Sequence, residues 1–410
     1  MQVPRGTFDI LPESALARAG VEALARELFE AAGYARIETP TFESTELFVR
    51  TVGEATDVVR KEMYTFDDGG GRSLTLRPEG TAPICRAYLE HGMHRLPAPV
   101  KLWYNSSFYR RERAQAGRYR QFWQIGAEAI GSDDPALDAE AILLLNDLLA
   151  AVGVKDVRLR LASLGSGDAR EAYRAELQNY LNAHIDQLSR DVRERIELNP
   201  LRAFDSSDPG TQAVMAKAPH LIDWLSEEDA KHFAKVRSLL DELDIDYEID
   251  PTLVRGLDYY TRTLFEFTSD SLGAQSGVGG GGRYDGLIEE IGGKQTPAVG
   301  WAAGIERMLL AAQSQPSQSS RKVDLYVAYT NPNVQDQAFL LSVAARQAGL
   351  GAQAELAGRG LKGQLKQGDR LGARYVALVE EDGEHVTLKE MASGQQRKVK
   401  RSEVIDEVKT

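Results

Sequence analysis

The sequence predicts an α+β fold with an antiparallel sheet and an inserted helical block, followed by a small α/β domain. Segments with strand patterns flank a polar, helix-rich stretch at about residues 167–245, and this order is typical of α+β domains. Residues 311–320, Ala-Ala-Gln-Ser-Gln-Pro-Ser-Gln-Ser-Ser, have the composition of a linker. Strand and helix patterns then alternate over residues 321–410, which predicts a largely parallel sheet. We therefore expect two domains, residues 1–320 and 321–410.

Periodicity places the elements of the first domain. Residues 13–32 predict a helix, because apolar residues recur at helical spacing and Gly33 stands where a C-terminal cap belongs. Residues 35–39 predict a strand that ends at Pro40. The other expected strands cover residues 74–77, 100–104, 122–126, 157–162, 247–249 and 264–267. A second helix is expected over residues 136–151.

The second domain shows a regular alternation of short elements. Strands are expected at residues 324–329, 352–356 and 375–379, and helices at residues 333–348 and 361–371. This alternation indicates a small α/β domain.

Composition excludes several classes of protein. Hydrophobic residues make up 42% of the chain and charged residues 27%, which is typical of a folded globular protein. The apolar runs are far shorter than the roughly 20 residues that cross a bilayer, and residues 1–5 lack the apolar core of a secretion signal. The single cysteine, Cys85, cannot form an internal disulfide. We therefore expect a cytoplasmic protein with no membrane partner.

The net charge of −12 does not decide whether the chain binds nucleic acid. Residues 1–320 carry 35 Lys and Arg against 49 Asp and Glu, whereas residues 321–410 carry 14 against 12. A protein with an acidic first domain and a mildly basic second domain can still bind RNA through local basic patches.

An arginine-rich segment is the first candidate site. Residues 108–122 read Phe-Tyr-Arg-Arg-Glu-Arg-Ala-Gln-Ala-Gly-Arg-Tyr-Arg-Gln-Phe, with five arginines between positions 110 and 120. Arginine suits phosphate because its planar guanidinium donates two hydrogen bonds at once. The alternative is an exposed hairpin whose charges are solvated. The aromatic residues at both ends favour a nucleotide, because a base can stack on such a ring.

Two further peptides contain the same residue types, namely Arg, Gly, Asp and Tyr. Residues 253–261 read Leu-Val-Arg-Gly-Leu-Asp-Tyr-Tyr-Thr, and residues 279–287 read Gly-Gly-Gly-Gly-Arg-Tyr-Asp-Gly-Leu. Together they resemble the two signature peptides of the histidyl-tRNA synthetases and their close paralogues. Arg110-Arg-Glu112 and Gly300-Trp-Ala-Ala-Gly-Ile-Glu-Arg307 resemble motifs 2 and 3 of the class II aminoacyl-tRNA synthetases. The helix and strand before Pro40 resemble motif 1, which in the family forms a homodimer interface.

The resemblance implies an ATP site. In the family Arg110 would bind the α-phosphate, Glu112 the adenine amino group, Phe122 the adenine face and Arg307 the γ-phosphate of magnesium-bound ATP. Arg255 would act with Arg110 in catalysis, because an arginine at this position does part of the work that a metal ion does in other synthetases. Fixed cations stabilise the charge that develops on the α-phosphate when a carboxylate attacks it.

The resemblance also implies an L-histidine site. The ligands of the α-ammonium group would be Glu79, Thr81 and Gln124. Glu128 and Tyr260 would meet the two imidazole nitrogens, and a ring with one donor and one acceptor nitrogen needs complementary polar groups at both edges. Tyr284 would help to close the pocket, and Arg255 would also contact histidine. Singly, Glu128 could be a surface carboxylate and Tyr260 a core aromatic residue.

The resemblance further implies tRNA(His) as a partner. Arg113 and Gln115 match family positions that approach the extra 5′ guanosine, and the helical insertion would lie against the acceptor stem. Residues 321–410 resemble the anticodon-binding domain of class IIa synthetases. Basic residues recur there every three or four positions, at 359, 362, 366, 370 and 374. A solvated helix face is the alternative for this pattern.

Two other readings compete with a histidine–tRNA ligase. The first is the synthetase-like regulatory subunit of ATP phosphoribosyltransferase, a paralogue that typically loses the tRNA module and erodes the ATP and histidine motifs. The second is an RNA-binding adaptor, which does not explain the intact ATP motifs.

Three local patterns do not predict functional sites. The glycines of residues 277–282 match a dinucleotide-binding pattern but lack the acidic residue about 20 positions on. His91 and His94 have no apparent third ligand for zinc. Cys85 is most simply a small buried side chain. We expect no metal site built from protein ligands alone.

Overall fold

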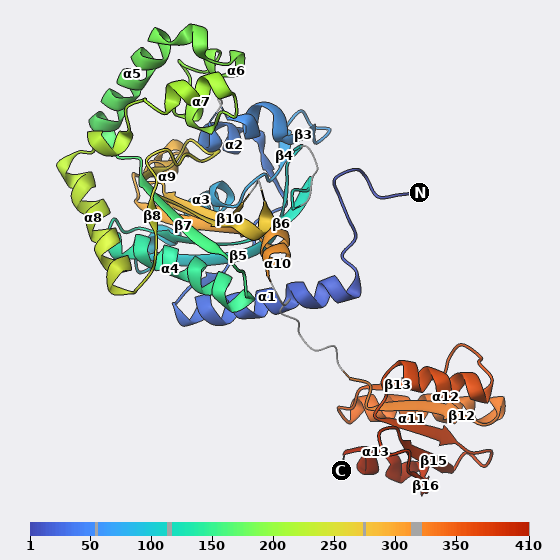
Figure 1. The fold of residues 1–410 in the computed structure, drawn as a ribbon. Helices are drawn as coiled ribbons and strands as arrows, with labels where there is room; N and C mark the ends of the chain where they lie inside the picture. Colours follow the sequence, from blue (N-terminus) through green and yellow to red (C-terminus); the bar gives the residue numbers. More distant parts are fainter. Residues whose placement is uncertain (54–55, 113–116, 274–275, 313–321, 410) are drawn as a thin grey trace. The chain divides into compact units, whose positions relative to one another are not determined.

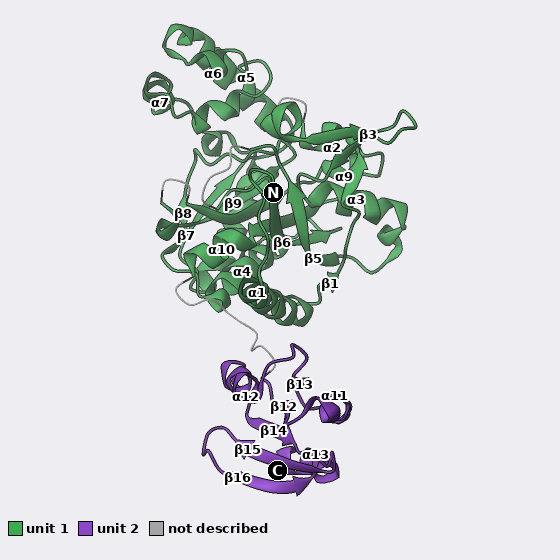
Figure 2. Cartoon of the chain, turned by 90° about the vertical axis from the view of Figure 1, so that its right-hand side faces the viewer, with its two compact units in different colours: residues 1–317 green, residues 318–410 purple. Residues whose placement is uncertain are grey.

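The computed structural model describes residues 1–53, 56–112, 117–273, 276–312 and 322–409. The chain divides into two compact units, residues 1–317 and 318–410 (Figure 2). Most of the expected linker, residues 313–320, lies outside the described residues. Ala311 is the last residue of a helix, and Ala312 pairs with Val154 in an isolated bridge.

The first unit is built on a sheet of eight strands in the order β1-β5-β6-β11-β10-β9-β7-β8 (Figure 1). The two outer pairs, β1–β5 and β7–β8, are parallel, and all other neighbouring pairs are antiparallel. The strands are β1 Ala35–Arg36, β5 Val100–Tyr109, β6 Gln121–Ile130, β7 Val157–Ser163, β8 Glu248–Ile249, β9 Thr261–Ser269, β10 Gly277–Arg283 and β11 Ala298–Gly304. The expected α+β class with an antiparallel sheet is confirmed.

The two faces of this sheet have different coverings (Figure 1). One face packs against α1 (Pro12–Ala31), α4 (Pro135–Val152), α8 (Glu227–Glu242) and α10 (Ile305–Ala311) in a single apolar core. The other face meets α3 (Thr81–Glu90), α9 (Leu287–Glu290) and the start of the helical insertion. The second face therefore has an apolar core of its own.

The ends of α4 show how the sequence sets a boundary. The side chain of Asp134 accepts a hydrogen bond from the backbone N of Ala136, and Pro135 occupies the first helical position. Gly153, with φ +84°, ends the helix in the left-handed region. Such N-terminal caps, prolines and C-terminal glycines are typical of stable helix ends.

The insertion expected over residues 167–245 is helical. It contains α5 (Gly167–Ala183), α6 (Arg190–Arg193), α7 (Pro209–Met215) and α8, with short 3₁₀ turns between them. The side chains of Ser189, Asp208 and Ser226 cap the last three of these helices. Because α8 also packs on the main sheet, the insertion is joined to the core at its C-terminal end.

A second, three-stranded sheet in the same unit has the order β2-β4-β3. Its strands are β2 Phe42–Ser44, β3 Tyr64–Asp67 and β4 Ser73–Leu76, and α2 (Thr45–Val52) packs beside it. Among the described residues, no helix of either unit is both long enough and apolar enough to cross a membrane.

The second unit has a five-stranded sheet in the order β13-β12-β14-β15-β16. Its elements are β12 Leu325–Tyr329, α11 Gln335–Gln347, β13 Ala352–Ala354, α12 Leu361–Arg370, β14 Tyr375–Val379, β15 His385–Glu390, β16 Gln396–Lys400 and α13 Val404–Lys409. Strands β13, β12 and β14 are parallel, whereas β15 and β16 add an antiparallel hairpin. The expectation of a largely parallel sheet therefore needs correction to a mixed sheet.

Two other differences from the sequence-based expectations have physical causes. The strand expected at residues 35–39 is only two residues long in β1, which lies at a sheet edge and pairs with β5 alone. Five of the seven residues of strand β10 are glycine. Because glycine is depleted in strands, the local pattern does not predict this strand.

Candidate active site

Strand alternation gathers the polar residues of β6 on one face of the sheet. Ile125 and Ala127 enter the core formed with α1 and α4. Since successive side chains point to opposite faces, Phe122, Gln124 and Glu128 share the other face. Phe122 packs there with the second apolar core, and Gln124 is half-buried. One strand thus delivers three of the residues that the sequence analysis selected.

Glu128 lies at the centre of the site. Its carboxylate is fully buried and accepts hydrogen bonds from Thr81 Oγ1 (2.8 Å) and from the hydroxyl of Tyr284 (2.6 Å). Burial raises the pKa of Glu128 to about 8, although both hydroxyl donors act in the opposite direction. A buried carboxylate with two fixed donors and such a pKa is a candidate for recognition of a polar ligand.

Glycines make room for these side chains. Gly300 lies opposite Glu128 in the β6–β11 ladder, and a Cβ on Gly300 would overlap Glu128 Oε2. A Cβ on Gly126 would similarly overlap the hydroxyl of Tyr104. The side chains of Glu128 and Tyr104 therefore fit above the sheet only because Gly300 and Gly126 carry no side chain.

Glu79 closes one side of the pocket. Its carboxylate accepts hydrogen bonds from the backbone N of Thr81 (2.7 Å) and of Ala82 (3.0 Å), at the first turn of α3. Burial raises the pKa of Glu79, and the two backbone donors and Arg110 oppose this shift. Buried Arg77 holds the peptide in place by donating to the carbonyl of Thr39 (2.6 Å).

Two adjacent tyrosines close another side. The rings of Tyr259 and Tyr260 are both buried, with centroids 4.7 Å apart. Arg170 on α5 donates to the carbonyl of Tyr260 at 2.6 Å. Burial raises the pKa of Tyr260 to about 12, so its phenol stays protonated and can donate or accept a hydrogen bond.

Arg255 stands beside this pocket as a fixed cation. Its guanidinium forms an ion pair with Glu266 on β9, and its side chain remains 26% exposed. Glu266 also pairs with Arg160 on β7 at 3.3 Å. The sequence analysis missed Glu266 and Arg160. The signal available for Glu266 was a single charge between Phe265 and Phe267 in an otherwise apolar strand pattern.

A second group of residues lies around the β5–β6 hairpin. The guanidinium of Arg110 lies 5.4 Å from the ring centroid of Phe122, and its Nε donates to the carbonyl of Pro78 at 2.9 Å. Glu112 is within 3.7 Å of Arg110 and 3.3 Å of Arg118. A stacked cation with an adjacent carboxylate suits a ligand that has both an anionic part and a ring.

Arg307 contributes a further cation from α10. Its Nε donates to the carbonyl of Gly277 at 2.5 Å, which links α10 to the start of β10. Burial lowers the pKa of Arg307, and the positive charge of Arg118 adds to the shift. Positive charges concentrated in this way favour a polyanionic ligand.

The N-terminal segment lies against the same hairpin. The backbone N of Arg120 donates to the carbonyl of Gly6 at 2.7 Å. The ring of Phe8 lies 4.5 Å from that of Tyr119. Residues before α1 therefore help to hold the arginine-rich hairpin.

The structure thus groups the expected residues in two sets. The first lies on the side of the sheet that carries Glu128 and Tyr260, and it comprises Glu79, Thr81, Gln124, Arg255, Tyr260 and Tyr284. The second comprises Arg110, Glu112, Phe122 and Arg307. Arg113 and Gln115 lie outside the described residues. Within the described part of the chain, no cluster of three or more His, Cys, Asp or Glu side chains could hold a metal ion.

Comparison with known families covers nearly the whole chain. A family model described as histidyl-tRNA synthetase matches residues 6–308, and one described as an anticodon-binding domain matches residues 324–410. A histidine–tRNA ligase of Thermosynechococcus vestitus is 46% identical over 99% of this chain and 96% of its own length. One from Synechococcus elongatus is 47% identical over 99% of this chain and 94% of its own length.

A solved structure gives the same result. The apo form of histidyl-tRNA synthetase from S. aureus superposes with a TM-score of 0.83 at 35% identity and covers 100% of both chains. A structure titled as an ATP phosphoribosyltransferase regulatory subunit/histidyl-tRNA synthetase from Bacillus halodurans has a TM-score of 0.65 at 23% identity, a likeness of fold alone.

Burial of Glu128 predicts a specific pH dependence of stability. Between pH 4.5 and about 8 the folded chain binds a proton on Glu128 that the unfolded chain has lost. The free energy of unfolding should therefore fall as pH rises through this window, by about 1.4 kcal/mol per pH unit from this group. Glu128→Gln, which cannot ionise, should lack this contribution when urea unfolding is compared with wild type across the window.

Glu30→Gln is the matched control, because Glu30 is an exposed carboxyl on α1. Its profile should run parallel to that of wild type. If the Glu128→Gln profile also runs parallel to wild type, Glu128 is not protonated by burial.

Proposed function

The chain belongs to the histidyl-tRNA synthetase family, and we propose that it joins L-histidine to ATP as histidyl-adenylate at the Glu128 pocket and then transfers the histidyl group to tRNA(His). The activity is that of a histidine–tRNA ligase, the name carried by relatives that match it over its whole length. The regulatory subunit of ATP phosphoribosyltransferase is not favoured, because the anticodon-binding domain and both groups of site residues are present.

The observation that carries this proposal is the buried, doubly hydrogen-bonded carboxylate of Glu128. A neutral imidazole has one donor nitrogen and one acceptor nitrogen. We assign Glu128 as the acceptor for the ring N–H, and the Tyr260 hydroxyl as the group that meets the other nitrogen. Tyr284 and Thr81 orient Glu128 for this contact. A pocket that pairs both ring nitrogens rejects side chains that leave these groups unpaired.

Three residues are proposed for the α-ammonium group of histidine: Glu79, Thr81 and Gln124. Glu79 and Glu128 lie on either side of Thr81 within one buried pocket, and burial raises the pKa of both carboxyls. A cation compensates the cost of burying such carboxylates. Histidine binding would therefore relieve part of the electrostatic cost that the empty pocket carries.

The second group of residues is proposed to hold ATP. The adenine ring would stack on Phe122, and Glu112 would accept a hydrogen bond from the adenine amino group. Arg110 would bind the α-phosphate, and Arg307 the γ-phosphate. The fixed positions of Arg110 and Arg307, held by the carbonyls of Pro78 and Gly277, support this orientation because preorganised donors lose little freedom on binding.

The reaction needs little proton transfer from the protein. The histidine carboxylate is already ionised when it attacks the α-phosphorus, and pyrophosphate leaves on the opposite side. Arg255 is proposed to stabilise the charge that builds on the α-phosphate oxygens, together with Arg110. Glu266 and Arg160 keep Arg255 in position. Magnesium would enter with ATP and neutralise phosphate charge, bound chiefly through phosphate oxygens.

The remaining assignments concern tRNA and assembly. The second unit would bind the anticodon, since single-stranded loops with splayed bases suit such recognition. The exposed side chains of Arg359, Lys362, Lys366 and Arg370, on α12 and just before it, support this assignment. Arg113 and Gln115 would approach the acceptor end. A homodimer through the segment around Pro40 completes the proposal.

Arg255→Ala should cut the rate of histidine-dependent ATP–pyrophosphate exchange by about 10²- to 10³-fold, because it removes a fixed cation that faces the transition state. Glu266 would remain paired with Arg160, so the fold should persist. Arg158→Ala removes a largely exposed arginine of the same sheet and is the matched control. Equal exchange rates in both variants would contradict the role of Arg255.

Removal of residues 321–410 should separate the two half-reactions. A chain that ends at residue 320 keeps every proposed ATP and histidine ligand, so exchange should continue. Charging of tRNA(His) should fall to background, because the anticodon contact is lost. Full charging by the shortened chain would exclude the proposed role of the second unit, and loss of exchange would show that the catalytic site depends on it.

A further inference from the structure

The β9–β10 ladder contains an irregularity directly beside the histidine pocket. Gly282 pairs with Leu264, but its neighbour Arg283 pairs with Thr261. Two residues of β9, Arg262 and Thr263, are therefore extra relative to β10. Such a bulge bends a strand and changes the direction of the side chains around it.

Arg262 has an unusual backbone within this bulge. Its φ is +44°, in the left-handed region that residues with a Cβ rarely adopt. Its backbone N donates to the carbonyl of Gly165 at 2.9 Å, and its carbonyl accepts from the backbone N of Leu164 at 2.7 Å. These two backbone hydrogen bonds contribute to holding the strained conformation.

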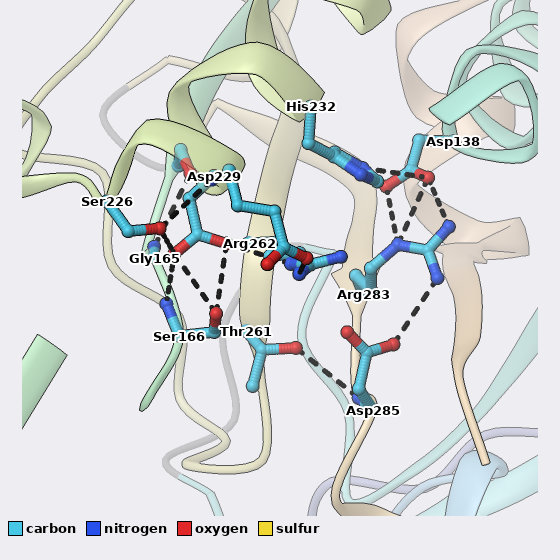
Figure 3. A network of polar contacts seen from close by, with 12 residues as sticks. Asp138, Gly165, Ser166, Ser226, Asp229, His232, Thr261, Arg262, Arg283 and Asp285 are labelled. Atoms are coloured by element: carbon cyan, nitrogen blue, oxygen red, sulfur yellow. Dashed lines mark hydrogen bonds and ion pairs between the residues drawn. The ribbon is translucent and has the colours of Figure 1, made fainter. Parts of the chain in front are cut away.

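The side chain of Arg262 connects this bulge to helix α8. Its Nε donates to Asp229 at 2.8 Å (Figure 3). Its Nη2 lies 2.5 Å from Glu228. Asp229 is 1% exposed and also accepts from the backbone N of Ser166 (3.0 Å) and the hydroxyl of Ser226 (2.9 Å). A buried carboxylate with this many donors is a rigid anchor.

The same helix reaches the second signature peptide. His232, one turn after Asp229 on α8, lies 3.4 Å from Asp138, which pairs with the fully buried Arg283 (Figure 3). Arg283 directly precedes Tyr284, the hydrogen-bond donor to Glu128. The backbone N of Asp285 donates to the hydroxyl of Thr261 at 3.3 Å, so the two peptides are also joined to each other.

Tyr260 lies immediately before this network. Its ring approaches Gly282 so closely that a Cβ there would be 3.0 Å from Tyr260 Cδ1. In register, Gly282 lies opposite Gly300, and Gly300 lies opposite Glu128. The bulge begins directly after Tyr260, on the side of the sheet where Gly282 and Gly300 separate Tyr260 from Glu128.

We propose that Arg262 and Asp229 are positioning residues for histidine binding: their ion pair holds the strained bulge of β9, and the bulge directs Tyr260 toward Glu128. This inference rests on the proposed function, because it assumes that the Tyr260–Glu128 pocket binds the imidazole ring. The last helix of the insertion thus determines the geometry of amino-acid recognition.

Substitutions at position 262 distinguish this role from a general structural one. Arg262→Ala keeps the two backbone hydrogen bonds and the strain of a Cβ at positive φ but removes the ion pair, so the left-handed backbone loses its side-chain anchor and should relax. Arg262→Gly removes the same ion pair, yet glycine adopts positive φ without penalty. The bulge should therefore persist in the glycine variant and be lost in the alanine variant.

The measurement is the KM for histidine and the KM for ATP in ATP–pyrophosphate exchange by the full chain. We expect Arg262→Ala to raise the KM for histidine by about tenfold or more with the KM for ATP unchanged, and Arg262→Gly to recover most of that loss. Asp229→Asn should raise the KM for histidine in wild type and have a smaller effect in the Arg262→Gly background. Glu228→Ala, which removes the exposed partner, is the control and should match wild type.

Three results would overturn the inference. These are equal KM values for histidine in the glycine and alanine variants, a parallel rise of both KM values, or a wild-type KM in Arg262→Ala. Absence of histidine-dependent exchange in wild type would instead refute the proposed function itself, so the two failures are distinguishable.

Discussion

Burial of the Glu128 carboxylate is the constraint on which the site depends. Burying a carboxylate away from water costs free energy unless hydrogen-bond donors surround it. Thr81 and Tyr284 supply two donors, and the absence of a side chain at Gly300 leaves the space. The raised pKa of Glu128 shows that these donors compensate the burial only in part. A polar ligand that fits between Glu128 and Tyr260 completes the compensation, and this is why we connect the pocket with imidazole.

The rest of the first unit can be understood as support for that constraint. One face of the main sheet is apolar and packs on α1, α4, α8 and α10, so the strands have little freedom to shift. The opposite face then carries polar residues at fixed alternate positions. The ion pairs of Arg255 with Glu266 and of Arg262 with Asp229 both involve residues of β9, an interior strand of the sheet. Glu128 and Gln124 rest on strand β6, whereas Glu79, Arg255 and Tyr284 lie in loops at the ends of strands and helices. Their geometry is set by packing and by the hydrogen bonds that hold these loops.

Local sequence patterns were sufficient for part of this picture. The helices of residues 13–32 and 136–151 and the helical insertion follow from periodicity and capping residues, because those signals act within a few residues. The resemblance to a known family then selected Glu128, Tyr260, Tyr284 and the arginines. Strand β10 could not be recognised in this way, since a Cβ at its glycines would collide mainly with backbone atoms of the neighbouring strands β9 and β11, contacts that a local pattern does not reveal.

Long-range contacts account for what the sequence did not reveal. Glu266 and Arg160 are 106 positions apart, and Arg262 and Asp229 are 33 positions apart. No local pattern links such residues. In the second unit the hairpin β15–β16 changes a parallel sheet into a mixed one, a choice that depends on pairing with β14. The structure was needed wherever a residue acts through a distant partner.

The most direct test of the central claim is ATP–pyrophosphate exchange with each of the twenty amino acids, in wild type and in Glu128→Gln. If the buried carboxylate selects imidazole, wild type will exchange only with histidine, and the Glu128→Gln variant will need a far higher histidine concentration at an unchanged KM for ATP. Exchange with another amino acid, or an unaltered KM for histidine in Glu128→Gln, would contradict the account.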